Sequence, residues 1–377
     1  MHDTNDKKLY FSCFYAFFYC GIVMLTVGSA LPDLRTAYSL TDTMSGALLS
    51  CYSLGNLASG IISGLMAVYL GQKPAVILLT ASICLGFSLL VWVNIPAVLF
   101  IACALAGLGR GSLITFSQRT ISILTGGTPR TTVMLHAAFA LGAITAPLMF
   151  SALRVISWKA GLILVAVLGV MAVCIFLSVR GYPEVRASSG GALTFLTERG
   201  FMLTAALMFL YLCCEFAVNG WLVTYMTHKN MSMNFSQSMA ALLWLVMLAG
   251  RLICAWLSKY VAQKKLLLVS ALGSAIFFAF MLVSEGSVHI ALSVACLGLC
   301  MAGISPIIYA ASAPYTSKYP MAMGVLFTIG CTGGTLMPAV TGMIAEHAGF
   351  DGGMSAILVT FALLVIFAGI NYRRKKS

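Results

Sequence analysis

The sequence predicts an all-α integral membrane protein in which twelve transmembrane helices form two parallel six-helix bundles. Three observations carry this prediction: an apolar composition, recurrent long apolar stretches, and an internal repeat of about half the chain. Of the 377 residues, 60% are hydrophobic and only 8% are charged, and the mean hydropathy is +0.99. Soluble domains contain about 25% charged residues, so this composition excludes an ordinary soluble protein.

Twelve apolar stretches are each long enough to cross a membrane. A hydrocarbon core about 30 Å thick needs roughly 20 helical residues, at about 1.5 Å per residue. Short connections join these stretches, so nearly the whole chain is expected in or beside the bilayer. The predicted spans are 10–31, 43–69, 74–93, 96–118, 131–153, 160–179, 200–226, 236–257, 265–284, 288–312, 321–344 and 352–371.

The basic residues predict how the spans are oriented. The chain carries 22 Lys and Arg against 10 Asp and Glu, a formal net charge of +12. If both termini are cytoplasmic, most of these basic residues fall on the inner side, as in the positive-inside pattern. This distribution accounts for the charge without a nucleic-acid partner. Together with the compact loops, it predicts a multi-pass protein of the bacterial inner membrane. The outer side receives only Arg35, Arg154, Lys159 and Lys229.

An internal repeat organises the chain. Residues 57–79 align without gaps to residues 248–270, an offset of 191 residues. Agreement of separate regions on one offset indicates duplication of a structural unit. The same offset also pairs Gly107 with Gly298, Gly142 with Gly333, and Pro147 with Pro338.

The repeat predicts the domain boundaries. Residues 1–179 are expected to form an N-terminal six-helix bundle, and residues 200–377 a C-terminal six-helix bundle. The segment between them, 180–199, is polar and contains Gly, Ser and Pro. Such a composition is typical of a linker, which the predicted orientation places in the cytoplasm.

Two parallel six-span halves resemble the major facilitator superfamily, and a local motif agrees. Between the second and third predicted spans, the segment GLMAVYLGQKP keeps Gly64, Gly71 and Lys73 of the superfamily pattern. It departs from that pattern at Val68, where an aspartate is expected. The departure concerns the inter-helix charge latch of the superfamily and leaves the implied fold, the major facilitator fold, unchanged.

A narrower resemblance concerns the substrate. Residues 107–149 and 215–226 are similar to the fucose/hexose:proton symporter branch. The resemblance implies alternating access around a site near the midplane, with the first, fourth, seventh and tenth spans lining the cavity. It further implies a small-molecule substrate, a proton gradient as the energy source with no bound cofactor, and a monomer surrounded by membrane lipid.

Glu215 is the foremost candidate because it stands within an otherwise apolar lining span. An ionised carboxylate at such depth is costly unless it is paired, so it is expected to be paired or to carry a proton. At about 100° per residue, Tyr211, Glu215, Asn219 and Tyr225 share one helix face. This face offers the donors and acceptors that a hydroxylated solute needs. It is therefore predicted to bind substrate, with Glu215 as the proton-coupling group; the alternative is that Glu215 only hydrogen-bonds a neighbouring span.

Arg110 is the second exceptional residue, because its permanent charge must face water, a substrate or a carboxylate. Gln118 lies about two turns further along the same face. Both are predicted to bind substrate, and Arg110 is also a candidate partner for Glu215. The alternative for Arg110 is that it braces a neighbouring span.

Three further residues are weaker candidates. His136, near the start of the fifth span, titrates near neutrality and is a candidate proton relay, although it is as consistent with capping or packing. Tyr19 and Tyr309, on the first and tenth spans, are candidate substrate-binding residues. Ordinary packing is the alternative for both tyrosines.

Small residues and cysteines are assigned to packing. Glycines four residues apart let helices approach closely. The twelve cysteines lie within predicted spans and have no CxxC spacing, so neither a disulfide nor a metal site is expected. The glycine pairs are Gly60/Gly64, Gly107/Gly111 and Gly330/Gly334.

Together these features predict a secondary active transporter and not an enzyme. The chain has no Walker motif, zinc-binding HExxH or GxSxG elbow, so it lacks the signatures of an ATP-driven pump or an intramembrane hydrolase. The leading prediction is proton-coupled uptake of a small polar solute such as a sugar. The alternatives are an organic-anion transporter in which Arg110 binds the anion, a drug efflux antiporter, and a non-transporting receptor that kept the fold.

Overall fold

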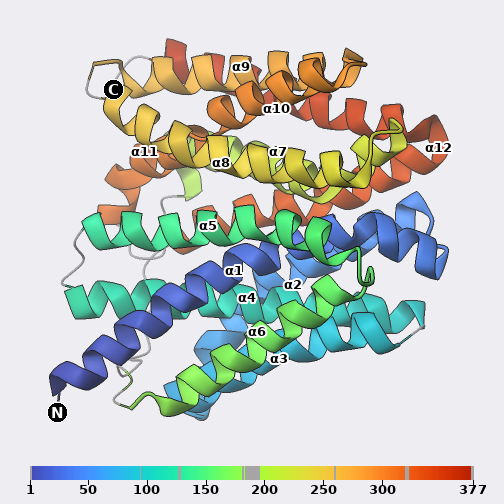
Figure 1. The fold of residues 1–377 in the computed structure, drawn as a ribbon. Coiled ribbons are helices and arrows are strands. Elements are labelled where there is room, and N and C mark those ends of the chain that lie inside the picture. Colours follow the sequence, from blue (N-terminus) through green and yellow to red (C-terminus); the bar gives the residue numbers. More distant parts are fainter. Residues whose placement is uncertain are drawn as a thin grey trace. The chain divides into compact units, whose positions relative to one another are not determined.

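The computed structural model consists of long helices that lie side by side within each of two compact units (Figure 1). Unit 1 comprises residues 1–40 and 47–188, and unit 2 comprises residues 41–46 and 189–377. Of the predicted linker, residues 181 and 183–195 lie outside the part of the chain that is described. The structure describes residues 2–93, 95–125, 129–180, 182, 196–258, 260–318 and 322–374.

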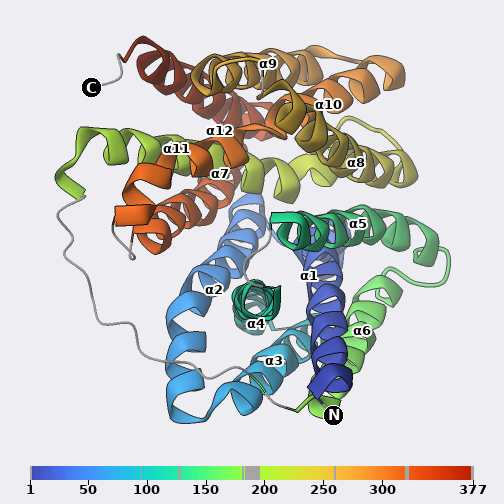
Figure 2. The same cartoon turned by 90° about the vertical axis from the view of Figure 1, so that its left-hand side faces the viewer.

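The helices of unit 1 surround α4. Figure 2 shows α4 end-on, with α1, α2 and α3 around it. An ion pair joins the end of α1 to the end of α5, because Nη1 of Arg154 lies 2.8 Å from Oδ1 of Asp33. The helices are α1 His2–Tyr38, α2 Asp42–Tyr69, α3 Gln72–Trp92, α4 Pro96–Thr125, α5 Pro129–Leu153 and α6 Ala160–Ser178.

The helices of unit 2 contain one break and one kink. α10 and α11 are separated at Ala302 and Gly303. Pro306 follows one turn later, and its ring clashes with the carbonyl four residues before it while providing no N–H. α12 is kinked at Gly349, whose φ of 76° lies in the left-handed region. The helices are α7 Arg199–His228, α8 Met233–Leu257, α9 Gln263–Val283, α10 Ser287–Met301, α11 Ile304–Lys318 and α12 Ala322–Arg373.

These interruptions reconcile the helices with the predicted spans. By length and composition, eleven helical segments in the described part of the chain are able to cross a membrane. One of them, Ser287–Ser312, joins α10 to part of α11. Another, Gly324–Arg373, is 50 residues long and contains the Gly349 kink, so it covers the last two predicted spans. Twelve predicted crossings therefore correspond to eleven continuous segments.

Close helix crossings recur in both units at the repeat offset. A Cβ added to Gly142 on α5 would collide with the carbonyl oxygen of Phe18 on α1, and one added to Gly333 on α12 would collide with that of Phe209 on α7. Both members of the first pair are 191 residues before their counterparts in the second. The same offset relates the crossing of Gly107 with the carbonyl of Tyr52 to the crossing of Gly298 with the carbonyl of Leu243. The same helix crossings thus occur within each unit, at positions that correspond in sequence.

The packing prediction is wrong for one glycine pair. A Cβ added to Gly60 or to Gly64 on α2 would meet no atom within 4 Å. By contrast, one added to Gly111 would collide with Ser59, and one added to Gly334 would lie 2.8 Å from the Phe216 ring. Glycines four residues apart permit a close approach of helices, but no neighbouring helix makes one at Gly60 and Gly64.

Candidate functional site

Each unit contains a group of buried polar side chains, and the predicted site residues are divided between them. In unit 2 the group is built on α7 and includes Tyr211, Glu215 and Asn219. In unit 1 it is built on α4 around Arg110. Polar groups removed from water must find partners inside the protein, so the contacts of each side chain indicate what it can still bind.

Tyr211 and Glu215 lie one turn apart on α7 and are joined by a hydrogen bond. Glu215 has 7% of its surface exposed, and Tyr211 is fully buried. The phenol of Tyr211 donates to the Glu215 carboxylate. This hydrogen bond partly satisfies the carboxylate.

Asn219 lies one turn beyond Glu215, and Trp244 on α8 fixes its amide. The indole N–H of Trp244 donates to Oδ1 of Asn219 at 3.0 Å. Because an indole nitrogen only donates, the amide oxygen must face Trp244 and Nδ2 must point elsewhere. Nδ2 is buried, and no described residue accepts a hydrogen bond from it. An unpaired buried donor costs about 1–3 kcal/mol, so this atom can bind an acceptor oxygen of a solute.

Two further side chains complete the group in unit 2. Tyr309 on α11 lies close enough to interact electrostatically with Glu215. Arg251 on α8 interacts in the same way with Tyr211, and its guanidinium carbon lies 5.7 Å from the centre of the Trp244 ring. Within unit 2, Glu215 therefore interacts with the phenols of Tyr211 and Tyr309, and Arg251 interacts with Tyr211.

Tyr225 lies apart from this group, although it was predicted on the same face. It is ten residues beyond Glu215, which is about 15 Å along a helix. Its hydroxyl donates to the carbonyl of Leu282 at 3.4 Å, and its ring stacks on Phe350 with centroids 6.1 Å apart. Tyr225 therefore belongs to the end of α7, while Tyr211, Glu215 and Asn219 form the group.

Arg110 is almost fully buried, with 5% of its surface exposed, and contacts both α1 and α2. Its Nε donates to the carbonyl of Cys20 at 3.3 Å, and its Nη1 donates to Oδ1 of Asn56 at 2.9 Å. Its Nη2 lies 3.4 Å from the sulfur of Met24, and the Phe139 ring lies 5.5 Å away. None of these partners is a carboxylate, so they orient the guanidinium without neutralising its charge.

The remaining candidates of unit 1 lie in two other places. Nε2 atoms of Gln118 and His136 are 3.3 Å apart, and the His136 ring packs edge-on against Phe17. Tyr19 is fully buried and its hydroxyl donates to the carbonyl of Val165 at 3.0 Å. The structure thus joins Gln118 to His136, and it directs the Tyr19 hydroxyl towards α6.

Sequence reasoning missed Trp244 and Asn56. Both are buried partners of predicted site residues, one on α8 and one on α2. Asn56 carries a detectable signal, because a primary amide within an apolar span is costly unless it is hydrogen-bonded. Trp244 carries none, since ordinary packing accounts for a tryptophan within an apolar span.

Comparisons with known proteins identify the family. The model of the Major Facilitator Superfamily matches residues 11–296 and 237–377. An uncharacterized transporter of this superfamily type from Yersinia pestis is 25% identical over 358 residues, covering 92% of each chain. A putative niacin/nicotinamide transporter from Bacillus subtilis is 24% identical over 362 residues, covering 90% of this chain and 88% of its own.

A solved structure supports the same fold. A D-xylose–proton symporter superposes with a TM-score of 0.81 at 11% identity, covering 97% of each chain. Similarity at this identity establishes the fold alone. The comparisons therefore confirm the predicted fold class, and the proteins that the chain resembles are transporters and not enzymes. The chain belongs to the Major Facilitator Superfamily and is a multi-pass membrane transporter.

Proposed function

We propose that this protein carries a small polar solute together with a proton, and that Glu215 accepts the proton. The single observation that carries the proposal is the group of Tyr211, Glu215 and Asn219 on α7. It presents a buried carboxylate bonded to a phenol, with an unpaired amide donor one turn away. A protonated and an ionised carboxylate offer different hydrogen-bonding groups. Protonation therefore changes what the group can bind.

The chemistry of the group favours a solute with hydroxyl or carbonyl oxygens. Asn219 supplies a donor, Glu215 supplies an acceptor or a donor according to its protonation, and Tyr309 supplies a phenol nearby. A sugar fits this set, in keeping with the resemblance to the fucose/hexose:proton symporter branch. The shared fold of the D-xylose–proton symporter is compatible with it. On this proposal the protein lies in the bacterial inner membrane, with both termini in the cytoplasm, and works as a monomer.

A binding and uptake experiment tests the proposal. The melting temperature of the purified protein is measured with neutral sugars, sugar acids, nicotinate and cationic drugs at acidic and at neutral pH. We expect a neutral sugar to stabilise the protein more strongly at acidic pH, and this pH dependence to disappear in Glu215→Gln. Uptake of the same sugar into proteoliposomes with an inward proton gradient should fall in parallel.

The matched control is Glu285→Gln, which removes an exposed carboxylate of the described chain outside the α7 group. It should leave both the pH dependence and the uptake intact. Stabilisation that depends on pH equally in wild type and in Glu215→Gln contradicts the assignment of the proton to Glu215. Binding without uptake in either protein favours a receptor that kept the fold.

The surroundings of Arg110 favour a second candidate function, the transport of an organic anion. Its guanidinium is buried, and none of the side chains that orient it within unit 1 is a carboxylate. One of the two compounds in the name of the Bacillus relative, niacin, is a carboxylic acid, while the other, nicotinamide, is neutral. In the same screen, this candidate requires stabilisation by acids only. Arg110→Gln should abolish that stabilisation, and Arg35→Gln, at the end of α1, should not.

A further inference from the structure

Arg251 on α8 carries a hydrogen-bond donor that the protein leaves unpaired. Its Nε is buried, and no residue in the described part of the chain accepts a hydrogen bond from it. A guanidinium stays charged in a protein and carries five N–H donors in one plane. Arg110 differs in this respect, because its Nε and Nη1 donate to oxygens of Cys20 and Asn56. Arg251 can therefore donate to a bound molecule.

The contacts of Arg251 place its guanidinium beside the α7 group. Its Cζ lies 5.7 Å from the centre of the Trp244 ring, and it interacts electrostatically with Tyr211. Trp244 and Arg251 are seven residues apart on α8, so they share one face of that helix. The indole N–H of Trp244 in turn donates to Asn219. One tryptophan thus contacts two side chains that each carry a buried, unpaired N–H donor.

Bracing of the helix bundle is the alternative role for Arg251. The attraction between a cation and an aromatic face holds the guanidinium against Trp244, but it satisfies none of the N–H donors. The internal repeat shows whether a bundle of this kind needs a cation here, because residue 251 corresponds to Gly60 at the offset of 191. A Cβ added to Gly60 would meet no atom within 4 Å.

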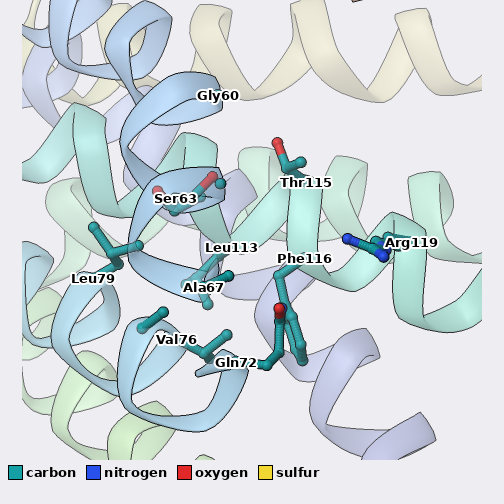
Figure 3. A pocket seen from close by; sticks show the side chains of 13 residues that line it. Gly60, Ser63, Ala67, Gln72, Val76, Leu79, Leu113, Thr115, Phe116 and Arg119 are labelled. Carbon is teal, nitrogen blue, oxygen red and sulfur yellow. The ribbon is translucent and has the colours of Figure 1, made fainter. Parts of the chain in front are cut away.

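Unit 1 has open space at this corresponding position. Gly60 lines a cavity of about 240 Å³ between α2, α3 and α4, together with Ser63, Leu79 and Thr115 (Figure 3). Unit 1 thus forms its helices without a side chain where unit 2 carries a guanidinium. Since the same helix crossings occur in both units, a cation at this position is not required for the fold. The comparison favours a binding role for Arg251 over bracing.

We infer that Arg251 binds the same solute as Asn219, and that their N–H groups donate to neighbouring oxygens of that solute. The inference rests on the proposed function, because it adds a residue to the same solute site. A planar guanidinium matches two adjacent oxygens, and its charge strengthens the hydrogen bonds to them. Adjacent oxygens occur as neighbouring hydroxyls in a neutral sugar and as the carboxylate in a sugar acid.

The first measurement needs no ligand. Arg251→Met removes the unpaired donor and keeps a long side chain that can pack on the Trp244 ring. Binding residues are commonly not optimal for stability, so we expect the melting temperature of the unliganded full-length protein to stay the same or rise. Lys265→Met removes an exposed cation of the same unit and is the matched control. A melting temperature below both wild type and this control identifies a bracing residue and overturns the inference.

The second measurement follows binding. The melting temperature in detergent at acidic pH is recorded against the concentration of D-xylose, L-fucose or D-gluconate. Losing a charge-assisted hydrogen bond should raise the half-maximal concentration by about tenfold or more in Arg251→Met, while Lys265→Met should leave it unchanged. A loss of affinity for a neutral sugar assigns the oxygens to neighbouring hydroxyls, and a loss for gluconate alone assigns them to a carboxylate.

The role of Arg251 and the proposed function fail in different ways. A solute that stabilises wild type and Arg251→Met at the same concentration overturns the role of Arg251, while the effect of Glu215→Gln still decides the proposed function. If no sugar or sugar acid stabilises the wild type, the proposed function and this inference are overturned together.

Discussion

At the scale of single residues, the defining feature is the amide of Asn219. The amide has an acceptor oxygen and a donor nitrogen. Because the indole N–H of Trp244 can only donate, Oδ1 of Asn219 faces Trp244 and Nδ2 faces away from it. Trp244 is therefore a positioning residue: it need not touch a solute to determine that Asn219 offers a donor. Arg110 is positioned in the same manner, by the amide of Asn56 and the carbonyl of Cys20.

The positioning role of Trp244 predicts that the effects of substituting Trp244 and Asn219 on stability are coupled. Trp244→Phe and Asn219→Ala remove the same hydrogen bond, which contributes about 0.5–1.5 kcal/mol. We therefore expect the two losses in melting temperature to be less than additive when both substitutions are combined. Thermal unfolding of the wild type, both single variants and the double variant measures this.

The control for this cycle is Trp221→Phe, which removes an equally buried indole. Its N–H donates to the carbonyl of Pro338 at 3.2 Å, not to Asn219. Combined with Asn219→Ala, it should give additive losses. Additivity in both cycles would contradict the role of Trp244.

At the scale of helices, the decisive contacts are backbone crossings at glycine. Gly142 lets α1 pack closely against α5, and Gly333 lets α7 pack closely against α12. Their partners are backbone carbonyls, which cannot move aside as a flexible side chain can. Such crossings set the spacing of the helices that carry Arg110's partners and the α7 group.

These crossings predict a loss of stability in both units. Gly142→Ala and Gly333→Ala should each destabilise the protein by about 1–3 kcal/mol, as overpacking of a core does. The melting temperature of the purified variants measures the effect. Gly369→Ala is the matched control, because its Cβ would meet nothing within 4 Å. Equal melting temperatures for all three variants would contradict the importance of the crossings.

At the scale of the whole molecule, the distribution of basic residues predicts the topology. With Lys and Arg concentrated on one side, the positive-inside pattern places both termini in the cytoplasm. Green fluorescent protein fused after Ser377 should therefore fluoresce, and alkaline phosphatase at the same position should be inactive. Fusions after Asn230, which follows α7, should give the opposite pair of results. The reverse pattern at both positions would invert the predicted orientation.

The amino-acid sequence alone predicts the membrane-spanning character, the twelve crossings and the duplication. Each of these follows from composition or periodicity, which are properties of contiguous residues. The pairing of Tyr211 with Glu215 was foreseeable for the same reason, because residues four apart meet on a helix. The charges of Arg110 and Glu215 were equally visible, since an ionisable residue within an apolar span is costly.

Which side chains from different helices meet is visible only in the folded structure. Trp244 against Asn219 and Arg110 against Asn56 depend on how α7 and α8, or α2 and α4, cross, and no local pattern encodes these crossings. The glycine prediction failed at Gly60 and Gly64 for the same physical reason. A small residue permits a neighbour to approach, but the packing of the whole unit determines whether one does, and here it leaves a cavity.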